Sequence, residues 1–252
     1  MYNNLKRILI FILLVLLWYW VCQLQLWSSY VLPSPQRVWS TFLVMANDGD
    51  LAEAICISAR RVFLGFGLAF IVSFTISLIG VFIPCLRPYY IHFVDFIRHI
   101  PPLSLIPLLI LWTGIGETPK IIVILLAAFS PLLLNIDAGL GGCSPQLLEV
   151  GKVLGFTQVQ QFFRIMLPSS LPHIFVGLRI SLGYSLRAII GAEMVAASSG
   201  LGYLILDAQT MSRTDRAMVG IFCIGLLGLV LDFLMGKMIQ HLFPYLQDIH
   251  HD

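Results

Sequence analysis

Residues 149–168 read EVGKVLGFTQVQQFFRIMLP, a run of polar and helix-favouring residues that stands between two long apolar segments. Just before it, Ser144 and Pro145 are typical of an N-cap and of the first position of a helix. Gly155 can adopt the left-handed backbone conformation that ends many helices. We therefore expect a first short helix to begin after Ser144 and to run to Leu154.

A second short helix is predicted after this glycine. Thr157 and Gln160 match the capping box, in which two side chains bond the free N–H groups at a helix start, and Pro168 is expected to stop the helix. Apolar side chains recur at helical spacing at Leu147, Val150 and Leu154, and at Val159, Phe162, Phe163 and Met166. A hairpin this short has no core of its own. Its apolar stripe must therefore pack on the chain's own transmembrane helices or on another protein.

The surrounding sequence is that of an integral membrane protein. Of its 252 residues, 58% are apolar and 11% are charged, whereas soluble proteins carry about 25% charged residues. The net charge of +2 and the lack of a basic run argue against a nucleic-acid-binding surface. The five cysteines have no metal or redox spacing, so we expect them to be packing residues.

A helix needs about 20 mostly apolar residues to cross a bilayer. Six segments of the chain are long enough, so six transmembrane helices are predicted. The first segment exceeds the about 7–15 residues of a signal-peptide core and no small-residue cleavage site follows it. The expected spans are 8–27, 51–84, 90–114, 119–140, 172–196 and 216–242. We divide the chain into an N-terminal helix with an external linker (1–50), a five-helix core that includes the hairpin (51–246), and a cytoplasmic tail (247–252).

The basic residues predict the orientation in the membrane. An even number of spans places both termini on one side, and lysine and arginine are enriched in cytoplasmic loops. The hairpin side would carry Lys6, Arg7, Arg87, Lys152, Arg164 and Lys237, against Arg37, Lys120, Arg213 and Arg216 on the other. Both termini and the hairpin are therefore expected to be cytoplasmic.

The hairpin also resembles a known motif. Glu149, Gly155, Ile165, Leu167 and Pro168 follow the spacing E-x5-G-x9-I-x-L-P, which is similar to the EAA loop of the permease subunits of bacterial ABC importers. EVG stands here where that family usually has EAA. Four further segments resemble the nitrate, sulfonate and taurine branch of the family: LPSPQRVW, IPPLSLIPLLILWTGIGE, GLRISLG and AEMVAASSGLG.

This resemblance implies an all-α fold of six transmembrane helices, that of a type I ABC importer permease in the bacterial inner membrane. The hairpin would be the coupling helix that docks on a cytoplasmic ATPase, through Glu149, Gly151, Gly155, Ile165, Leu167 and Pro168. The implied partners are two ATPase copies, an extracytoplasmic substrate-binding protein, a second permease copy and membrane lipid. The substrate would be a small anion such as nitrate, a sulfonate, taurine or bicarbonate; a vitamin or its precursor, such as the thiamine pyrimidine or riboflavin, is the alternative.

Other functions lack their sequence signatures. The pairs Gly151-Lys152 and Gly236-Lys237 lack the earlier glycine of a phosphate-binding loop, so ATP hydrolysis is assigned to a partner. No nucleophile elbow, metal-spaced histidine cluster or paired carboxylate is found, so neither an enzyme nor a cofactor is expected. His250-His251 is expected to be a solvated tail. The repeated halves typical of secondary transporters are also not seen.

Ionisable residues within the spans are candidates for the translocation path, because charge in a bilayer is costly. The candidates are Arg60, Arg61, Arg187 and Glu193. Arg187 has two open interpretations: it contacts a passing anion, or it is the counter-ion of a carboxylate such as Glu193 on a neighbouring helix or subunit. Structural pairing or snorkelling is expected for Asp95, Arg98, Asp137 and Arg179.

Overall fold

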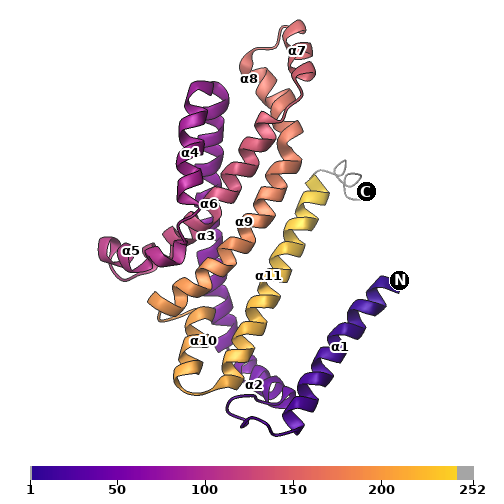
Figure 1. The fold of residues 1–252 in the computed structure, drawn as a ribbon, viewed down its shortest axis with the longest axis vertical. Helices are drawn as coiled ribbons and strands as arrows, with labels where there is room; N and C mark the ends of the chain where they lie inside the picture. Colours follow the sequence, from indigo (N-terminus) through magenta and orange to yellow (C-terminus); the bar gives the residue numbers. More distant parts are fainter. Residues whose placement is uncertain (1, 243–252) are drawn as a thin grey trace.

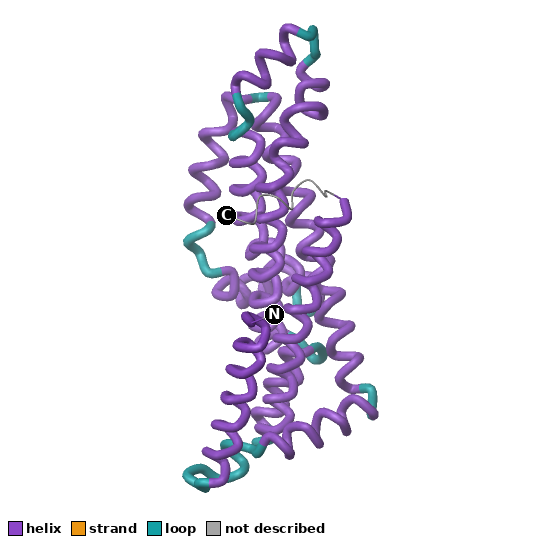
Figure 2. The backbone as a smooth tube through the Cα atoms, turned by 90° about the vertical axis from the view of Figure 1, so that its right-hand side faces the viewer, coloured by secondary structure: helices purple, strands orange, loops and turns teal. Residues whose placement is uncertain are grey.

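The computed structural model describes the backbone of residues 2–242 and the side chains of these residues other than 2–8, 11 and 242. The expected tail at 247–252, with His250 and His251, and the side chains of Lys6 and Arg7 lie outside the described residues. Within residues 2–242 the chain is helical and contains no strand (Figure 2).

The helices run mostly along the long axis of the molecule (Figure 1). In chain order they are α1 (Tyr2–Gln23), α2 (Pro35–Asn47), α3 (Asp50–Phe82), η1 (Pro84–Leu86), α4 (Arg87–Ile97), η2 (Pro102–Leu105), α5 (Ile106–Thr113), α6 (Glu117–Gly141), α7 (Pro145–Val153), α8 (Gln158–Gln161), η3 (Phe162–Met166), α9 (Leu167–Ala196), α10 (Leu201–Thr210) and α11 (Thr214–Leu242). The expected external linker thus contains a helix, α2, whose N-cap Ser34 accepts a hydrogen bond from the Arg37 N–H.

Four of the described helices are long and apolar enough to cross a membrane, and a bent pair raises the number to five. The four are α3, α6, the continuous helix Gln158–Ala196 and α11. The first expected span falls on α1, whose described apolar part, Ile12–Gln23, is shorter than a full span. The predicted count of six is therefore not confirmed.

The third expected span is not one helix, and this prediction was wrong. Pro84–Ile97 and Pro102–Thr113 meet at an angle of 82°. Pro101 and Pro102 lack the N–H groups that a continuous helix would need, and Pro101 holds the preceding backbone out of the helical region. The chain therefore leaves α4 at Arg98 and restarts in η2 and α5.

α6 is the central helix, and more than half of its most apolar segment is buried. It packs against α3 and α9, and the largest buried apolar cluster adds α11, with Phe66, Leu132, Leu182 and Leu231 among its members. A Cβ atom at Gly65 would lie 2.6 Å from the Cβ of Ile124, and one at Gly177 2.7 Å from the Cβ of Asn135. Small residues therefore let the helices approach closely, as is common in membranes.

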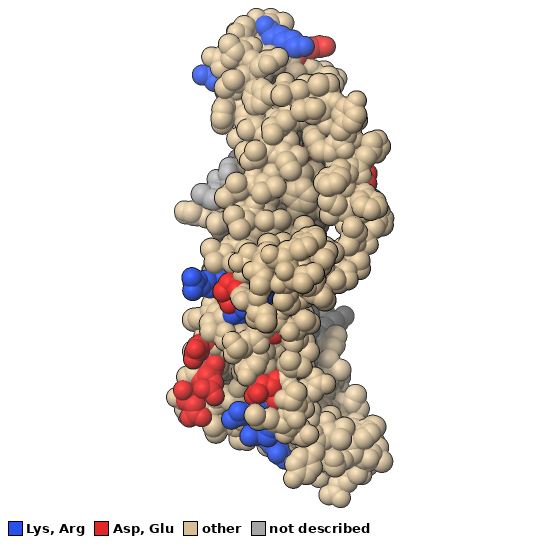
Figure 3. All heavy atoms as spheres, turned by 90° about the vertical axis from the view of Figure 1, so that its left-hand side faces the viewer, with Lys and Arg blue, Asp and Glu red and all other residues tan. Residues whose placement is uncertain are grey.

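The two ends of the bundle differ in structure. α7 and α8 extend beyond α6 and α9 at one end, whereas α2, α10 and the α10–α11 turn lie at the other (Figure 1). On the face drawn in Figure 3, charged side chains lie near the hairpin tip and from the middle of the molecule toward the opposite end. Between them lies a wide region whose charge is confined to one small acidic patch at its edge. The nearly uncharged stretch is the part of this face suited to contact lipid, because charge in a bilayer is costly.

Cysteine labelling tests this orientation. Single cysteines at Thr157, on the hairpin, and at exposed Met211, in the α10–α11 turn, are expected to react with a membrane-impermeant maleimide from opposite sides, Thr157 from the cytoplasm. Gly200 is a poor site for a probe, because its Cβ would lie 2.5 Å from the Glu193 carboxyl carbon.

The labelling starts from a chain in which the exposed Cys56 and Cys85 are replaced by serine, and this parent chain is the unlabelled control. Labelling of both probes from the same side would mean that the bundle does not span the membrane as described.

Candidate functional site

The first hairpin helix ends as its glycine predicts. α7 runs over Pro145–Val153 with Leu154 at its C-cap, and Gly155 has a φ of 74°. The Phe156 N–H donates to the Gly151 carbonyl at 2.9 Å and the Gly155 N–H donates to the Lys152 carbonyl at 3.0 Å. This is the Schellman pattern, which requires a left-handed residue at the glycine position.

The second helix begins as expected but does not end as expected. The Thr157 N–H donates to Gln160 Oε1 at 2.9 Å, and the Gln160 N–H donates to Thr157 Oγ1 at 3.3 Å, so the capping box is present. Pro168, however, lies in the first turn of α9 within one helix over Gln158–Ala196. The π-helical turn Phe162–Met166 precedes it; by changing the hydrogen-bond register there, this turn lets the chain pass the proline.

One close contact joins the two helices of the hairpin. Gly151 is buried, and a Cβ at this position would lie 2.7 Å from Ile165 Cδ1. Gly151 and Ile165, two of the predicted coupling residues, therefore lie against each other. Apart from Gly155 and its two chain neighbours, no residue of the described chain has an atom within 4 Å of the position of a Cβ at Gly155. Gly155 therefore serves the turn itself, and its outer side is open.

The apolar stripe of the hairpin divides into a buried and an exposed part. Phe162 is 2% exposed and packs in the main core beside Phe82. Val153 is 87% exposed. The other exposed apolar side chains of the hairpin are Leu147, Val150, Leu154, Val159 and Phe163. Packing on the chain's own transmembrane helices therefore accounts for only part of the stripe.

A buried network of charged groups lies toward the opposite end. Arg61 is 3% exposed and Glu193 is 0% exposed, and Arg61 Nη1 donates to Glu193 Oε1 at 2.7 Å. Arg61 also donates from Nε and Nη2 to the two carboxylate oxygens of Glu117, both at 2.7 Å. Buried Lys120 bonds Glu117 Oε1 at 2.7 Å. The Glu117 side chain is 57% exposed, so it lies at the edge of this network. The two positive and two negative charges balance, which offsets part of the cost of burying Arg61, Lys120 and Glu193.

The turn before α10 is built around the Glu193 carboxylate. Ser58 Oγ lies 2.8 Å from both carboxylate oxygens, and the Gly202 N–H donates to Oε2 at 2.9 Å. Gly200 has a φ of 107°, and a Cβ at Gly202 would lie 2.5 Å from the Ile190 carbonyl oxygen. The glycines of SSGLG therefore let the backbone wrap closely over the charge.

This network corrects one interpretation of Arg187. Arg61, and not Arg187, is the counter-ion of Glu193 in this chain. Arg61 was expected to add to the field of a translocation path; its charge is instead matched by two carboxylates. Arg60 is exposed on α3 and is not part of the network.

The motifs that seemed separate in the sequence meet here. Glu117 ends IPPLSLIPLLILWTGIGE, and Glu193, Ser199 and Gly202 belong to AEMVAASSGLG; the Ser199 carbonyl accepts from Arg61 Nη1 at 2.7 Å. The roles of Glu117 and Lys120 were missed, because both lie beside a predicted span end where charge is ordinary. The presence of Glu117 at the end of the motif IPPLSLIPLLILWTGIGE was the sequence feature that could have indicated its role.

A second buried carboxylate was expected only to pair or snorkel. Asp137, near the hairpin end of α6, accepts from Arg87 Nε at 2.9 Å and from the Tyr90 hydroxyl at 2.6 Å. Pairing is confirmed for Asp137, and also for the Arg98–Asp95 and Arg179–Asp232 pairs. At this end of the bundle, a buried acidic group thus ties α6 to the neighbouring helix α4.

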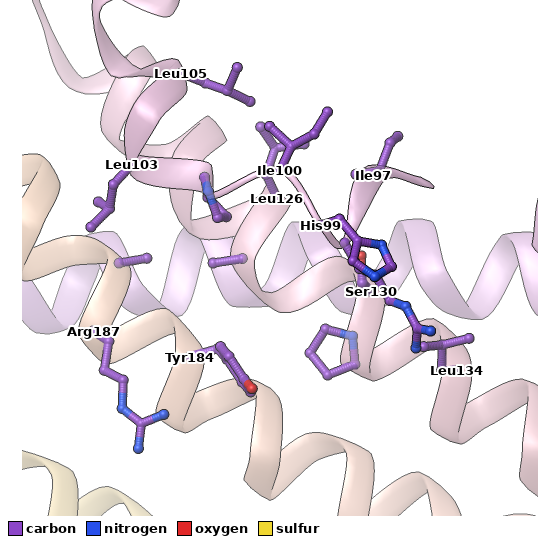
Figure 4. A pocket seen from close by; sticks show the side chains of 15 residues that line it. Ile97, His99, Ile100, Leu103, Leu105, Leu126, Ser130, Leu134, Tyr184 and Arg187 are labelled. Carbon is purple, nitrogen blue, oxygen red and sulfur yellow. The ribbon is translucent and has the colours of Figure 1, made fainter. Parts of the chain in front are cut away.

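A cavity of about 670 Å³ lies where the third span is broken, between α4, η2, α6 and α9. Arg187 and Tyr184 of α9 line one part of it, and His99 and Ser130 line another (Figure 4). The Arg187 guanidinium lies 5.7 Å from the centre of the Tyr184 ring and forms no ion pair with a described residue. Of the four candidate path residues, Arg187 is the one that lines this cavity.

Comparison with known proteins agrees with the all-helical fold. Residues 84–243 match the family described as binding-protein-dependent transport system inner membrane component. The chain is 34% identical to the putative aliphatic sulfonates transport permease protein SsuC of Bacillus subtilis (strain 168), covering 92% of this chain and 84% of the relative. It is 31% identical to the taurine transport system permease protein TauC of Escherichia coli (strain K12), covering 92% and 86%.

A third relative is the nitrate import permease protein NrtB of Leptolyngbya laminosa, at 30% identity over 79% of this chain and 71% of the relative. Among solved structures, the chain is similar to an amino acid ABC transporter crystallised with histidines, with a TM-score of 0.62, 17% identity and coverage of 80% of this chain and 96% of that one. It is also similar to the inward-facing MetNI methionine ABC transporter, with a TM-score of 0.59, 18% identity and coverage of 73% and 94%. At these identities the two structures show the shared fold.

Proposed function

The chain belongs to the family of binding-protein-dependent transport system inner membrane components, and from this premise we propose that it is the permease subunit of an ATP-driven importer for a small organic or inorganic anion. A cytoplasmic ATPase hydrolyses the ATP, and an extracytoplasmic binding protein delivers the substrate. Two permease copies enclose the path, with both termini in the cytoplasm of a bacterial cell.

The observation that carries this proposal is the exposed apolar face of the hairpin. Val153 and Leu154 are 87% and 63% exposed at the tip of the bundle, beyond the ends of α6 and α9 (Figure 1). Exposed apolar side chains at such a site favour binding to another protein, because contact with water is unfavourable for them. Lipid surrounds the membrane spans and does not reach the end of the hairpin. An ATPase groove that receives α7 supplies this burial, as in helix-in-groove recognition.

The hairpin is suited to transmit force in both directions. The continuous helix Gln158–Ala196 joins α8 to the core, and the Gly151–Ile165 contact holds α7 against it. When the two ATPase subunits close, they move the hairpins together and turn the helices as rigid bodies, which opens the path on the other side. Glu149, exposed on α7, is placed to contact the ATPase.

An anion is the substrate that the observations support best. The relatives named above are described as permeases for sulfonates, taurine and nitrate. Arg187, at the cavity, is a cation without a carboxylate partner among the described residues. A neutral or cationic vitamin precursor would form no ion pair with the Arg187 guanidinium, so we do not favour that alternative.

Changing the exposed tip tests the ATPase contact. Val153→Asp is expected to detach the ATPase during purification in detergent, because a carboxylate would be buried without a partner in the groove. The stability of the permease itself is expected to stay within about 0.5 kcal/mol of wild type, as for other exposed positions. Retention of the ATPase at the wild-type ratio would argue that α7 is not the contact.

The matched control is Ser169→Asp. Ser169 is exposed in the first turn of α9, near the hairpin but outside it, and it receives the same charge. We expect this variant to co-purify with the ATPase as wild type does.

A further inference from the structure

The cavity at the broken span combines apolar walls with a restricted set of polar groups. Leu103, Leu105 and Leu126 are among the fifteen residues that line it, and aspartate and glutamate are absent from this set. Arg98, which also lines the cavity, is paired with Asp95 at 3.3 Å. The unpaired positive charge at the cavity is therefore that of Arg187.

A second observation indicates a polar ligand. Ser130 is 5% exposed, and its hydroxyl has no hydrogen-bond partner in the described structure. The side chain lines the same cavity as Arg187, on another wall (Figure 4). A buried hydroxyl without a partner is costly. Because the Ser130 oxygen is almost inaccessible in this structure, it bonds a ligand atom in the cavity when the side chain turns toward it.

We propose that this cavity is a transit site for a monoanion with an uncharged apolar tail, an alkanesulfonate or its like, and that Arg187 contacts the anionic group. The proposal rests on the importer function proposed above and specifies its substrate class. The planar guanidinium donates paired hydrogen bonds to sulfonate oxygens, and the leucine walls receive the alkyl tail. An ammonium group on the tail would find no carboxylate among the lining residues and would be desolvated without a partner.

The volume adds a size argument. At about 670 Å³ the cavity falls within the range of about 300–1,000 Å³ that small-molecule sites occupy. A bare nitrate ion would leave the leucine walls without contacts. Each additional methylene of an alkanesulfonate is instead expected to tighten binding about fourfold, until the cavity is filled.

The test compares two molecules of nearly equal size, 1-propanesulfonate and taurine, in which a methyl group replaces the ammonium. The permease–ATPase complex is purified without its binding protein, and the concentration dependence of the melting temperature gives the Kd of each probe. We expect 1-propanesulfonate to bind at least about tenfold more tightly than taurine, and methanesulfonate to bind more weakly than 1-propanesulfonate.

Two variants assign this binding to the cavity. Arg187→Gln is expected to weaken 1-propanesulfonate binding about tenfold or more. Ser130→Ala is expected to weaken it less, while slightly raising the melting temperature of the ligand-free complex, because it removes a buried hydroxyl without a partner. The control is Arg179→Gln on the same helix, whose guanidinium pairs with Asp232 and does not line the cavity; it should bind the probe as wild type does.

The results separate this proposal from the importer function. ATP-driven uptake by the wild-type complex with its binding protein tests the importer function alone. If uptake occurs but taurine binds as tightly as 1-propanesulfonate, or Arg187→Gln binds the probe as wild type does, the transit site is wrong and the importer function stands. Absence of ATP-driven uptake of any anion would overturn the importer function itself.

Discussion

The Arg61→Leu variant is expected to lose about 3–5 kcal/mol of unfolding free energy, because it leaves a buried carboxylate without its counter-ion. Glu193 is 0% exposed, and Arg61 is its ion-pair partner at 2.7 Å. The remaining donors, Ser58 Oγ and the Gly202 N–H, solvate the charge but do not neutralise it. Reversible denaturation of the purified permease in detergent measures the loss.

Two further variants show that the loss comes from this charge. Arg60→Leu removes the same side chain from an exposed neighbouring position and should change the stability by about 0.5 kcal/mol or less. Adding Glu193→Gln to Arg61→Leu should recover part of the loss, because the buried charge is then gone. A loss below about 1 kcal/mol in Arg61→Leu, without recovery in the double variant, would show that the network is not a structural tie.

The second large effect concerns coupling. Gly155→Val is expected to leave the protein inserted and folded while transport-linked ATP hydrolysis falls about tenfold or more. The left-handed φ of 74° costs a residue with a side chain about 1–2 kcal/mol, and more when it is β-branched. The Schellman turn would then reopen and α7 would leave its docking position for most of the time. Co-purification of the ATPase and substrate-stimulated hydrolysis are the measurements.

Gly155→Asn is the matched control, because asparagine tolerates the left-handed conformation. Since the space outside this position is open in the described chain, the added side chain meets no steric obstacle there. We expect Gly155→Asn to keep most of the coupling. Equal losses in both variants would mean that the close approach of a partner, and not the turn, requires glycine.

The hairpin could be predicted because its determinants are local. Pro145 at the first helical position, the left-handed Gly155 and the Thr157–Gln160 capping box act within a few residues, so the sequence pattern suffices. Ser144 occupies the N-cap position, but its side chain forms no capping hydrogen bond. The end of the second helix could not be predicted this way. A proline usually stops a helix, and the π-helical turn that carries the chain past Pro168 has no comparable sequence signal.

At Pro168 the effect of a proline was overestimated, whereas in the third span it was underestimated. Hydropathy treated 90–114 as one helix, since apolar residues predominate there despite Asp95 and Arg98, and gave too little weight to the Pro101-Pro102 pair. The two halves of this span meet at 82°, and the break forms a wall of the cavity. Hydropathy therefore failed to predict a feature that is central to the proposed substrate path.

The charged network depended on contacts that no local pattern contains. Arg61 lies 132 positions from Glu193 along the chain, and Glu117 is brought to Arg61 by the packing of α6 against α3. Spacing along α9 places Arg187 and Glu193 on different faces of the helix, so they do not pair with each other. It could not reveal which arginine on another helix would take the place of Arg187.

ATP-driven uptake in proteoliposomes tests the central claim most directly. The vesicles contain the permease with its ATPase, with ATP inside and the loaded binding protein outside, and no ion gradient. The account predicts accumulation of an anion that requires ATP hydrolysis, is lost in Val153→Asp and persists in Ser169→Asp. Accumulation that is driven by an imposed ion gradient, needs no ATP and is unaffected by Val153→Asp would contradict it.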